Sequence, residues 1–177
     1  MPEILQISQL GNPVLRQPSQ VVENVKDDRI QQLIDNLIST VQQANGVGIA
    51  APQAAKCDRL FIVASRPNLR YPQAPKMEPT AMINPRILAA STETVKDWEG
   101  CLSIPGIRGL VPRSRAIEIE YTCRDGKVHR QELTDFVARI FQHEYDHLEG
   151  IVFLDRVENT RELMTEDEYQ QQFVKLL

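Results

Sequence analysis

Two histidines one helical turn apart constrain this chain more than any other feature of its sequence. The segment His143-Glu-Tyr-Asp-His147 follows Phe136 and Ile140, so apolar and imidazole side chains recur at intervals of four, three and four residues. That spacing places them on one face of an α-helix, with both imidazoles able to bind the same metal ion. Because the rest of this face is apolar, it packs into the core. The sequence therefore predicts a buried helix and a buried metal site.

The length and composition are typical of a folded domain of ordinary size. The chain has 177 residues, of which 42% are hydrophobic and 25% charged, and its net charge is −4. A chain of this length buries roughly 70% of the surface that its unfolded form exposes. We therefore expect a single domain over residues 1–177 and exclude the disordered and coiled-coil classes. The scattered lysines and arginines argue against direct nucleic-acid binding, and we expect neither a membrane span nor secretion.

Three cysteines, Cys57, Cys101 and Cys123, stand in a chain without an export signal. This indicates a reducing compartment, where each is a thiol or a metal ligand rather than half of a disulfide. Cys57 and Cys123 lie in polar surroundings and are interpreted as structural or surface thiols. His129 stands alone in a polar strand, where we expect it to be exposed and without a role.

Further patterns predict strands and two more helices. An amphipathic helix is expected over residues 27–45, and the metal-bearing helix is expected to run from a cap at Thr134 to Gly150. A capping box predicts a last helix with Tyr169, Phe173 and Leu176 on one side. Strand-like runs cover residues 60–64, 80–90, 92–98, 116–122 and 127–133, with a hairpin turn at Asp125-Gly126 before the last. This order of elements predicts an α+β fold.

Three segments outside these elements are interpreted as loops. Residues 46–53 are small and predicted to be flexible, and residues 99–106 are predicted to form a shaped loop rich in glycine and proline. The proline-rich segment 66–79 is expected to lie on the surface, because repeated proline denies the backbone the donors that a strand ladder requires.

The helix motif does not supply a third metal ligand, which a catalytic site needs beside an open coordination position. In the common extension of the motif a histidine stands six residues after the second one, but here Phe153 occupies that position. Glu158 and Glu162 are alternatives, although the stretch around them is polar and uncapped. Cys101 is the better candidate, since it lies among glycines, a serine and a proline.

Three segments together resemble the signature motifs of the peptide deformylases, in the same order. They are Gly46-Val-Gly-Ile-Ala-Ala-Pro-Gln53, Glu99-Gly-Cys-Leu-Ser103 and Gln142-His-Glu-Tyr-Asp-His-Leu-Glu-Gly150. The likeness extends between the motifs and over Gly11-Asn-Pro-Val-Leu-Arg16, so it covers most of the chain. It implies an α+β domain, with mostly antiparallel strands around a central metal-bearing helix. It also implies a hydrolase that removes the formyl group from the N-formylmethionine of new polypeptides and releases formate.

The resemblance implies a metal centre and a base. Cys101, His143 and His147 are expected to hold one divalent metal ion, and Glu144 to carry the proton from the attacking water to the leaving amine. Thiolate and imidazole ligands suit zinc and ferrous iron alike. The family implies Fe²⁺ as the physiological ion, with Zn²⁺ or Ni²⁺ as alternatives in purified protein.

The resemblance also assigns roles around the metal. Gln53 and the backbone N–H of Leu102 are expected to stabilise the oxyanion that forms on attack. Val47 and Gly48 are expected to pair with the main chain of the substrate, and Gly100 to form the opposite wall.

The surroundings of the site leave one open question. Glu99, Arg113 and Asp146 are interpreted as ion pairs that support the site or the fold, without chemistry of their own. Arg139 stands one turn before His143, where an aliphatic residue makes a simpler wall for a methionine side chain. Its guanidinium either shapes the pocket or reaches solvent.

The expected partner is an N-formylmethionyl polypeptide in the bacterial cytoplasm. Residues 158–168 are rich in acidic side chains, so we expect any transient contact of this tail with the ribosome to be weak or absent. Two other functions stay open at this point. One is a zinc-dependent peptidase with the same His-Glu-x-x-His core, and the other is a metal-dependent binding module without catalysis.

Overall fold

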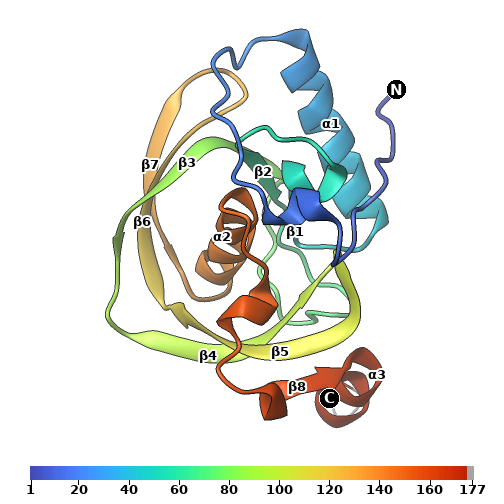
Figure 1. Ribbon diagram of the computed structural model, residues 1–177. Coiled ribbons are helices and arrows are strands. Elements are labelled where there is room, and N and C mark those ends of the chain that lie inside the picture. The colour runs from blue at the N-terminus through green and yellow to red at the C-terminus, as the bar shows by residue number, and fades with distance from the viewer. Residues whose placement is uncertain (175–177) are drawn as a thin grey trace.

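The computed structural model describes residues 1–174, whose strands form two antiparallel sheets (Figure 1). The first sheet has the order β1 (Gly48–Ala50), β2 (Leu60–Val63), β3 (Thr80–Ala90), β6 (Ala116–Thr122) and β7 (Val128–Thr134). The second has the order β4 (Thr94–Cys101), β5 (Ile104–Ser114) and β8 (Leu163–Thr165). The helices are α1 (Asp28–Gln43), α2 (Asp135–Leu148) and the short α3 (Glu166–Tyr169), which continues as a π-helical turn, Gln170–Val174. The predicted α+β class with mostly antiparallel strands is confirmed.

Helix α2 lies at the centre of the molecule, enclosed by strands of both sheets (Figure 1). Its Ile140 and Phe141 are buried against Phe61 and Met82 of the first sheet. The predicted buried helix is therefore confirmed. It follows Thr134 as expected, although the Thr134 side chain makes no capping hydrogen bond.

The end of α2 depends on a glycine. Gly150 has φ +73°, and a Cβ there would lie 2.7 Å from the carbonyl group of Arg16. A larger residue would therefore push away the N-terminal segment that passes over this end of the helix.

Helix α1 covers the opposite face of the first sheet. Alternate side chains of β2 point to opposite sides, so Leu60 and Ile62 pack with α1, and Phe61 and Val63 pack with α2. The helix predicted over residues 27–45 is confirmed as Asp28–Gln43, with the Asp27 side chain accepting a hydrogen bond from the N–H of Arg29. Strand β2 is buried on both faces, so it fixes α1 and α2 relative to each other.

Two segments predicted to be loops contain strands. Residues 48–54 form β1 and a 3₁₀ turn, and every one of them is buried, so the expectation of a flexible segment is wrong. Residues 99–106 were predicted to be a loop, but β4 ends at Cys101 and β5 begins at Ile104. Only a short turn between them joins the two strands. A three-residue strand and a proline-containing strand carry no periodicity from which the sequence could reveal them.

The C-terminal segment forms one outer edge of the fold. Strand β8 pairs with Ile107–Gly109 of β5, and the Thr165 side chain caps α3 by accepting from the N–H of Glu168, as predicted. Leu176, predicted to share a helix side with Tyr169, lies outside the described residues. Within residues 1–174, none of the helices combines the length and apolar character that crossing a membrane requires.

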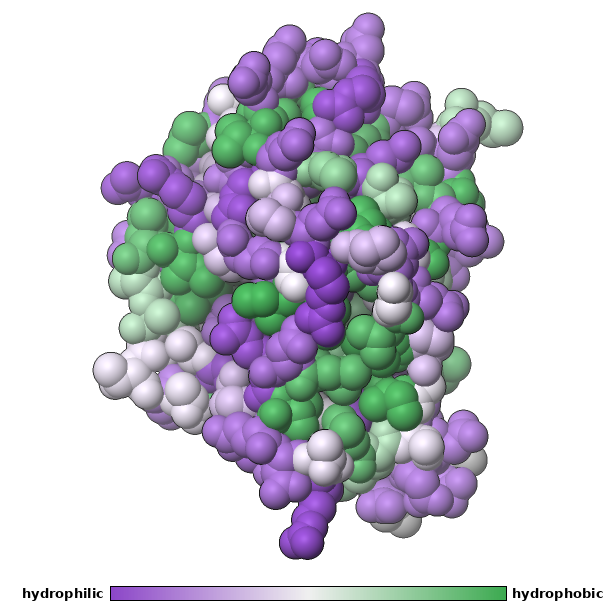
Figure 2. Space-filling view, in the orientation of Figure 1, coloured by the Kyte–Doolittle hydropathy of each residue, from purple (hydrophilic) through white to green (hydrophobic). Residues whose placement is uncertain are grey.

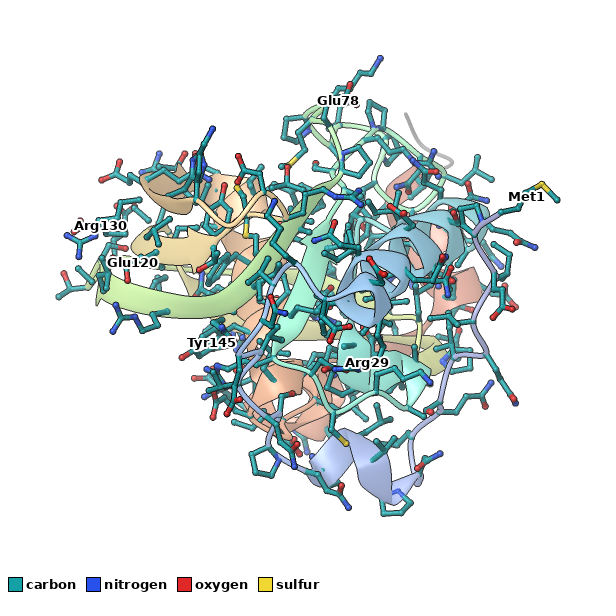
Figure 3. The ribbon with its side chains drawn as sticks, turned by 90° about the horizontal axis from the view of Figure 1, so that it is seen from above. Met1, Arg29, Glu78, Glu120, Arg130 and Tyr145 are labelled. Carbon is teal, nitrogen blue, oxygen red and sulfur yellow. The ribbon has the colours of Figure 1, made fainter. Side chains whose placement is uncertain are left out.

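The outer surface is mostly polar. Figure 2 shows polar side chains over most of one face, with apolar ones in several patches, one of them in the lower half near the C-terminal segment. Figure 3 shows Glu120 and Arg130 side by side at the edge of the molecule, where Arg130 Nε donates to Glu120 at 2.6 Å. The outer surface of β6 and β7 thus carries ion pairs, and the chemistry lies inside.

Candidate active site

Three potential metal ligands meet beside α2. The Sγ of Cys101 and one ring nitrogen each of His143 and His147 all lie within 4.8 Å of one another, and all three residues are buried. Cys101 Sγ is 3.3 Å from His147 Nε2. One thiolate and two imidazoles are a donor set that zinc and iron both accept. The structure thus brings together the three ligands that the sequence predicted.

One unpaired polar atom at this cluster supports a bound ion. Glu144 Oε2 is buried and has no hydrogen-bond partner among residues 1–174. Buried polar atoms are nearly always satisfied by a partner, an ordered water or an ion. His147 Nδ1 is also unpaired, but Nε2 is the nitrogen of that ring that faces Cys101. The donor set and the unpaired carboxylate oxygen therefore fit a divalent metal ion with solvent beside it.

Glu158 and Glu162, the alternative ligands, lie elsewhere. Both carboxylates bind the ammonium group of Lys96 on β4 at the surface. Neither belongs to the buried ligand cluster. The alternative in which a glutamate completes the metal site is therefore wrong for this fold.

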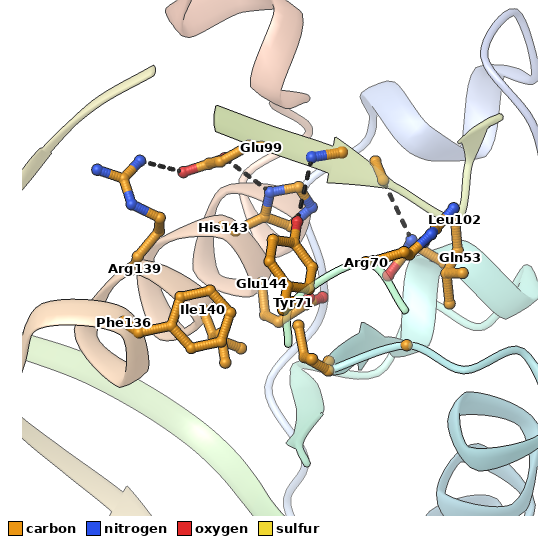
Figure 4. A pocket seen from close by; sticks show the side chains of 15 residues that line it. Gln53, Arg70, Tyr71, Glu99, Leu102, Phe136, Arg139, Ile140, His143 and Glu144 are labelled. Carbon is orange, nitrogen blue, oxygen red and sulfur yellow. Dashed lines mark hydrogen bonds and ion pairs between the residues drawn. The ribbon is translucent and has the colours of Figure 1, made fainter. Parts of the chain in front are cut away.

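Glu99 orients the first histidine. Its Oε2 lies 2.9 Å from His143 Nδ1, which leaves Nε2 of that ring free to face the metal position. Arg113 binds the same carboxylate through two hydrogen bonds of 2.9 and 3.0 Å, and Arg139 adds a third of 2.9 Å (Figure 4). Burial by itself raises the pKa of Glu99, but Arg113 and His143 outweigh it and hold that pKa well below its usual range.

The ion pairs continue through the core. Arg113 Nη1 also donates to Asp146 at 2.6 Å, and the exposed Arg156 binds the other oxygen of Asp146 at 2.8 Å. The prediction that Glu99, Arg113 and Asp146 form supporting ion pairs is confirmed. Each buried carboxylate of this network therefore has at least one cationic partner.

We expect Arg113→Met to destabilise the protein strongly. The change leaves Glu99 and Asp146 buried with one cationic partner fewer each, so the free energy of unfolding should fall by about 3–5 kcal/mol. Urea unfolding measures the loss. Arg115→Met is the matched control, because Arg115 also binds two carboxylates but is half exposed, and its loss should leave the free energy of unfolding nearly unchanged. Equal losses in the two variants would contradict the role of burial.

Arg139 is buried, so the alternative in which its guanidinium reaches solvent is wrong. Besides Glu99, it donates to the backbone carbonyl groups of Val111 and Val95, at 2.8 and 2.6 Å. Carbonyl groups of β4 and β5 thus replace the water that an exposed guanidinium would bind. The side chain closes one end of the pocket and leaves its apolar wall to Phe136 and Ile140 (Figure 4).

Glu144 is buried at the pocket, between the two histidines in the sequence. Burial, as the largest cause, raises its pKa to about 7. Such a carboxyl group can both accept and donate a proton near neutral pH. Gly48 makes room for it, since a Cβ at Gly48 would lie 2.5 Å from Glu144 Oε1.

Gln53 is held in one orientation. Its Oε1 accepts from the N–H of Ala50 at 2.9 Å, so its amide nitrogen points to Ser103 Oγ at 3.1 Å and Cys101 Sγ at 3.5 Å. Leu102, in the turn after Cys101, lines the same pocket. The predicted pair of donors thus lies next to the predicted metal ligand.

All of the predicted site residues except His147 line one pocket (Figure 4). Val47 stands directly before β1, Gly48 is the first residue of β1, and Gly100 lies on β4. His147 lies behind Cys101, with its Nε2 toward the thiol. The sequence missed Tyr71, whose hydroxyl oxygen accepts from the N–H of Gly100 at 3.4 Å. Tyr71 stands in a proline-rich loop without a periodic pattern, so nothing in the sequence indicated that it lines the pocket.

A second group of potential ligands lies at the hairpin between β6 and β7. Atoms of Cys123, Asp125 and His129 also fall within 4.8 Å of one another, but Asp125 and His129 are exposed. Asp125 accepts from the N–H of Lys127 and pairs with its ammonium group. His129 is therefore at the surface, as predicted, and this group has no buried, unpaired atom to mark a site.

The chain is similar to known proteins over nearly its whole length. The family model described as polypeptide deformylase matches residues 4–162. A protein of Nostoc sp. named peptide deformylase 2 is 67% identical over 174 residues, which cover 98% of this chain and 97% of that protein. A peptide deformylase 2 of Shewanella oneidensis is 46% identical over 152 residues, which cover 86% and 83%.

Solved structures agree. The class I type b peptide deformylase of Acinetobacter baumannii with Met-Ala-Ser bound has a TM-score of 0.86 and 41% identity, over 89% of this chain and 100% of that one. A peptide deformylase of Synechococcus elongatus in complex with actinonin has a TM-score of 0.79 and 35% identity, over 95% and 85%.

Proposed function

Because this chain belongs to the polypeptide deformylase family, it is a hydrolase that removes the N-formyl group from newly made polypeptides, and we propose that Cys101, His143 and His147 hold its metal ion. The observation that carries the proposal is the buried cluster of one thiol and two imidazoles that opens on a pocket. A divalent cation bound there supplies a Lewis acid and makes hydroxide available near neutral pH.

Glu144 is proposed as the proton carrier. Its buried carboxyl group faces the pocket, and its raised pKa suits a group that takes a proton from water and later gives it to the leaving amine. The N–C bond of the formamide breaks in that last step, and formate and a free amino terminus leave.

Gln53 and Leu102 are proposed to stabilise the oxyanion. The Gln53 amide is preorganised by its bond to the N–H of Ala50, so its N–H₂ group needs no reorientation when charge develops on the formyl oxygen. The backbone N–H of Leu102 would be the second donor. Losing one such donor typically costs about 2.7–4 kcal/mol of transition-state stabilisation.

Val47, Gly48 and Gly100 are proposed to bind the main chain of the substrate. They stand at β1 and β4, on the two walls of the pocket, and each of these strands is the edge strand of its sheet, which can pair with an extended peptide. The Acinetobacter baumannii relative is described with Met-Ala-Ser bound, a tripeptide of the product type, which supports a peptide at this site.

Formate release from formyl-Met-Ala-Ser tests the function. We expect formate to appear in step with free amino termini, and we expect no cleavage between the residues of the same peptide without its formyl group. A zinc-dependent peptidase, the alternative with the same helix motif, would instead cut the unformylated peptide. Metal analysis of the same preparation should find one ion per chain.

Fe²⁺ is proposed as the physiological ion. The thiolate and two imidazoles accept either Fe²⁺ or Zn²⁺, and ferrous iron is lost to oxidation in air. Protein purified without oxygen should therefore turn over formyl-Met-Ala-Ser faster than the same protein loaded with Zn²⁺. Ni²⁺ is a second ion that can replace Fe²⁺ in purified protein. Equal turnover of the two forms would overturn this assignment.

Contact of the C-terminal tail with the ribosome is expected to be weak or absent, as for an enzyme that meets nascent chains in the bacterial cytoplasm by diffusion. Three acidic groups of this tail bind cations of the chain itself, Glu166 to Arg108 and the two earlier glutamates to Lys96. Asp167 and Glu168 stay exposed, and their charge disfavours contact with RNA. We therefore expect no salt-sensitive cosedimentation with ribosomes. Cosedimentation that disappears when residues after Thr160 are deleted would contradict this.

A further inference from the structure

We propose that the N-terminal segment holds the two oxyanion donors in place, through main-chain hydrogen bonds from Ser8 and Leu10. Residues 3–12, which we call the N-terminal strap, run alongside α1 and then pass the site (Figure 1). None of residues 3–12 lines the pocket of Figure 4, so they can act only through the residues that they bind. This inference rests on the proposed function, because Gln53 and Leu102 matter as donors only if a formyl group is attacked beside them.

The first bond holds the turn that carries Gln53. The N–H of Ser8 donates to the carbonyl oxygen of Gln53 at 2.7 Å. Gln53 belongs to the 3₁₀ turn Ala51–Ala54, and the last carbonyl groups of such a turn have no partner within it. An unpaired carbonyl group is costly where it is buried, and Gln53 is only 1% exposed. The strap therefore supplies the partner that fixes the main chain of Gln53.

The second bond holds the turn that carries Leu102. Leu102 and Ser103 form the turn between β4 and β5. The N–H of Leu10 donates to the carbonyl oxygen of Ser103 at 2.8 Å, and the buried Ser103 hydroxyl group accepts from the amide of Gln53 at 3.1 Å. The two turns are thus joined twice, once directly and once through the strap, which fixes the two donors relative to each other.

The other half of the strap is anchored on α1. The N–H of Glu3 donates to Asn36 Oδ1 and the N–H of Leu5 donates to Thr40 Oγ1, both at 2.9 Å. Asn36 and Thr40 are polar residues one turn apart on the buried face of α1. Leu5 and Ile7 also pack against the apolar core beneath this helix. A rigid helix therefore anchors the strap, so the strap can hold the two turns at the site.

Loosening either turn should slow the chemistry and spare substrate binding. The oxyanion exists only after attack, so its donors stabilise the transition state without strengthening the binding of the substrate. A misplacement of about 1 Å can cost about 100-fold in rate. Loss of one strap bond should therefore lower kcat by about 10–100-fold. KM should stay nearly unchanged, because the main-chain groups proposed to bind the substrate keep their places.

Proline substitutions remove one N–H at a time. Ser8→Pro removes the donor to Gln53, and we expect kcat for formyl-Met-Ala-Ser to fall by about 10–100-fold, with KM and metal content near their starting values. Ser8→Ala keeps the N–H and should retain most of the wild-type kcat. Gln6→Pro is the matched control, since Gln6 is exposed and its N–H has no acceptor among residues 1–174. It should leave kcat unchanged.

A Gln53→Ala background tests whether the strap acts through Gln53. Residues that act through one another show non-additive effects. Without the Gln53 amide, the position of its turn matters little to the oxyanion, so Ser8→Pro should lower kcat there by about threefold at most. An equal fall in both backgrounds would overturn the inference, because the strap would then act elsewhere.

Leu10→Pro gives an independent measurement at the second turn. It removes the donor to Ser103 and should lower kcat in the same way, whereas Leu10→Ala keeps the N–H and should not. If Ser8→Pro does not fold, this pair decides. If both proline variants lose their metal and unfold at lower urea concentrations, the strap serves the fold and the inference is overturned.

The outcomes separate this inference from the proposed function. If the wild-type protein releases formate and both folded proline variants keep its kcat, the strap does not position the donors and the proposed function stands. If Gln53→Ala releases formate at the normal rate, the oxyanion role of Gln53 fails and the inference fails with it. If the wild-type protein releases no formate from any formyl peptide, the proposed function itself is wrong.

Discussion

Glu144→Gln should lower formate release by about 10²–10⁴-fold while the protein keeps close to one metal ion per chain. A positioned proton carrier typically contributes this factor. Glutamine keeps the shape of the side chain beside Gly48 and leaves Cys101, His143 and His147 in place, so only the proton transfer is lost. Formate release and metal analysis on the same sample measure the two effects separately.

The matched control lies one residue beyond the same helix. Glu149 carries the same functional group but is exposed and bound to Arg59 at 2.6 Å, outside the pocket. Glu149→Gln should therefore leave formate release and metal content near their starting values. A Glu144→Gln protein with near-normal turnover would remove Glu144 from the mechanism.

Cys101→Ala should empty the metal site or weaken metal retention greatly. A thiolate contributes both a coordination bond and a negative charge, and the two imidazoles that remain supply neither the charge nor a third ligand. We expect the purified variant to contain much less than one ion per chain and to release formate only at background rate. Metal analysis after dialysis against a weak chelator measures the loss.

Cys57 and Cys123 are controls built into the chain. Cys57 is exposed and Cys123 is half-buried, and neither belongs to the buried cluster of metal ligands. Alanine at either position should change neither metal content nor turnover. A Cys101→Ala protein with full metal content and full activity would contradict the assignment of Cys101 as a metal ligand. The contradiction would be strongest if a substitution at Glu158 or Glu162 abolished metal binding and activity.

Several parts of the fold and of the site could be predicted from the sequence because their signals are local. The period of apolar residues predicted α1 and α2, and the spacing of His143 and His147 placed both rings on the inner face of α2. Cys101 needed more than spacing, since it lies 42 residues before His143. The glycines, serine and proline around it favoured it over the glutamates, and the resemblance of the whole segment then assigned it. With that resemblance, all three residues of the buried cluster could be named from the sequence.

Other features depend on tertiary packing. Arg139 is buried because carbonyl groups of β4 and β5 and the carboxylate of Glu99 surround it, and no pattern near position 139 encodes those partners. Strand β1 exists because it pairs with β2 and packs against α2, not because its own three residues alternate. In both cases the environment comes from residues far away in the sequence.

The contacts of Arg108 with Tyr71, Tyr169 and Glu166 show the same limit most clearly. Tyr71 belongs to a proline-rich loop, Arg108 to β5 and Tyr169 to the C-terminal helix, and each was unremarkable in its own segment. They meet because β8 pairs with β5 and brings Glu166, 58 residues away in sequence, onto the guanidinium of Arg108. Periodicity and capping act over a few residues, so the sequence was sufficient to predict the helices and the chemistry that they carry. The surroundings of that chemistry come from contacts between distant segments, which exist only once the whole chain has packed.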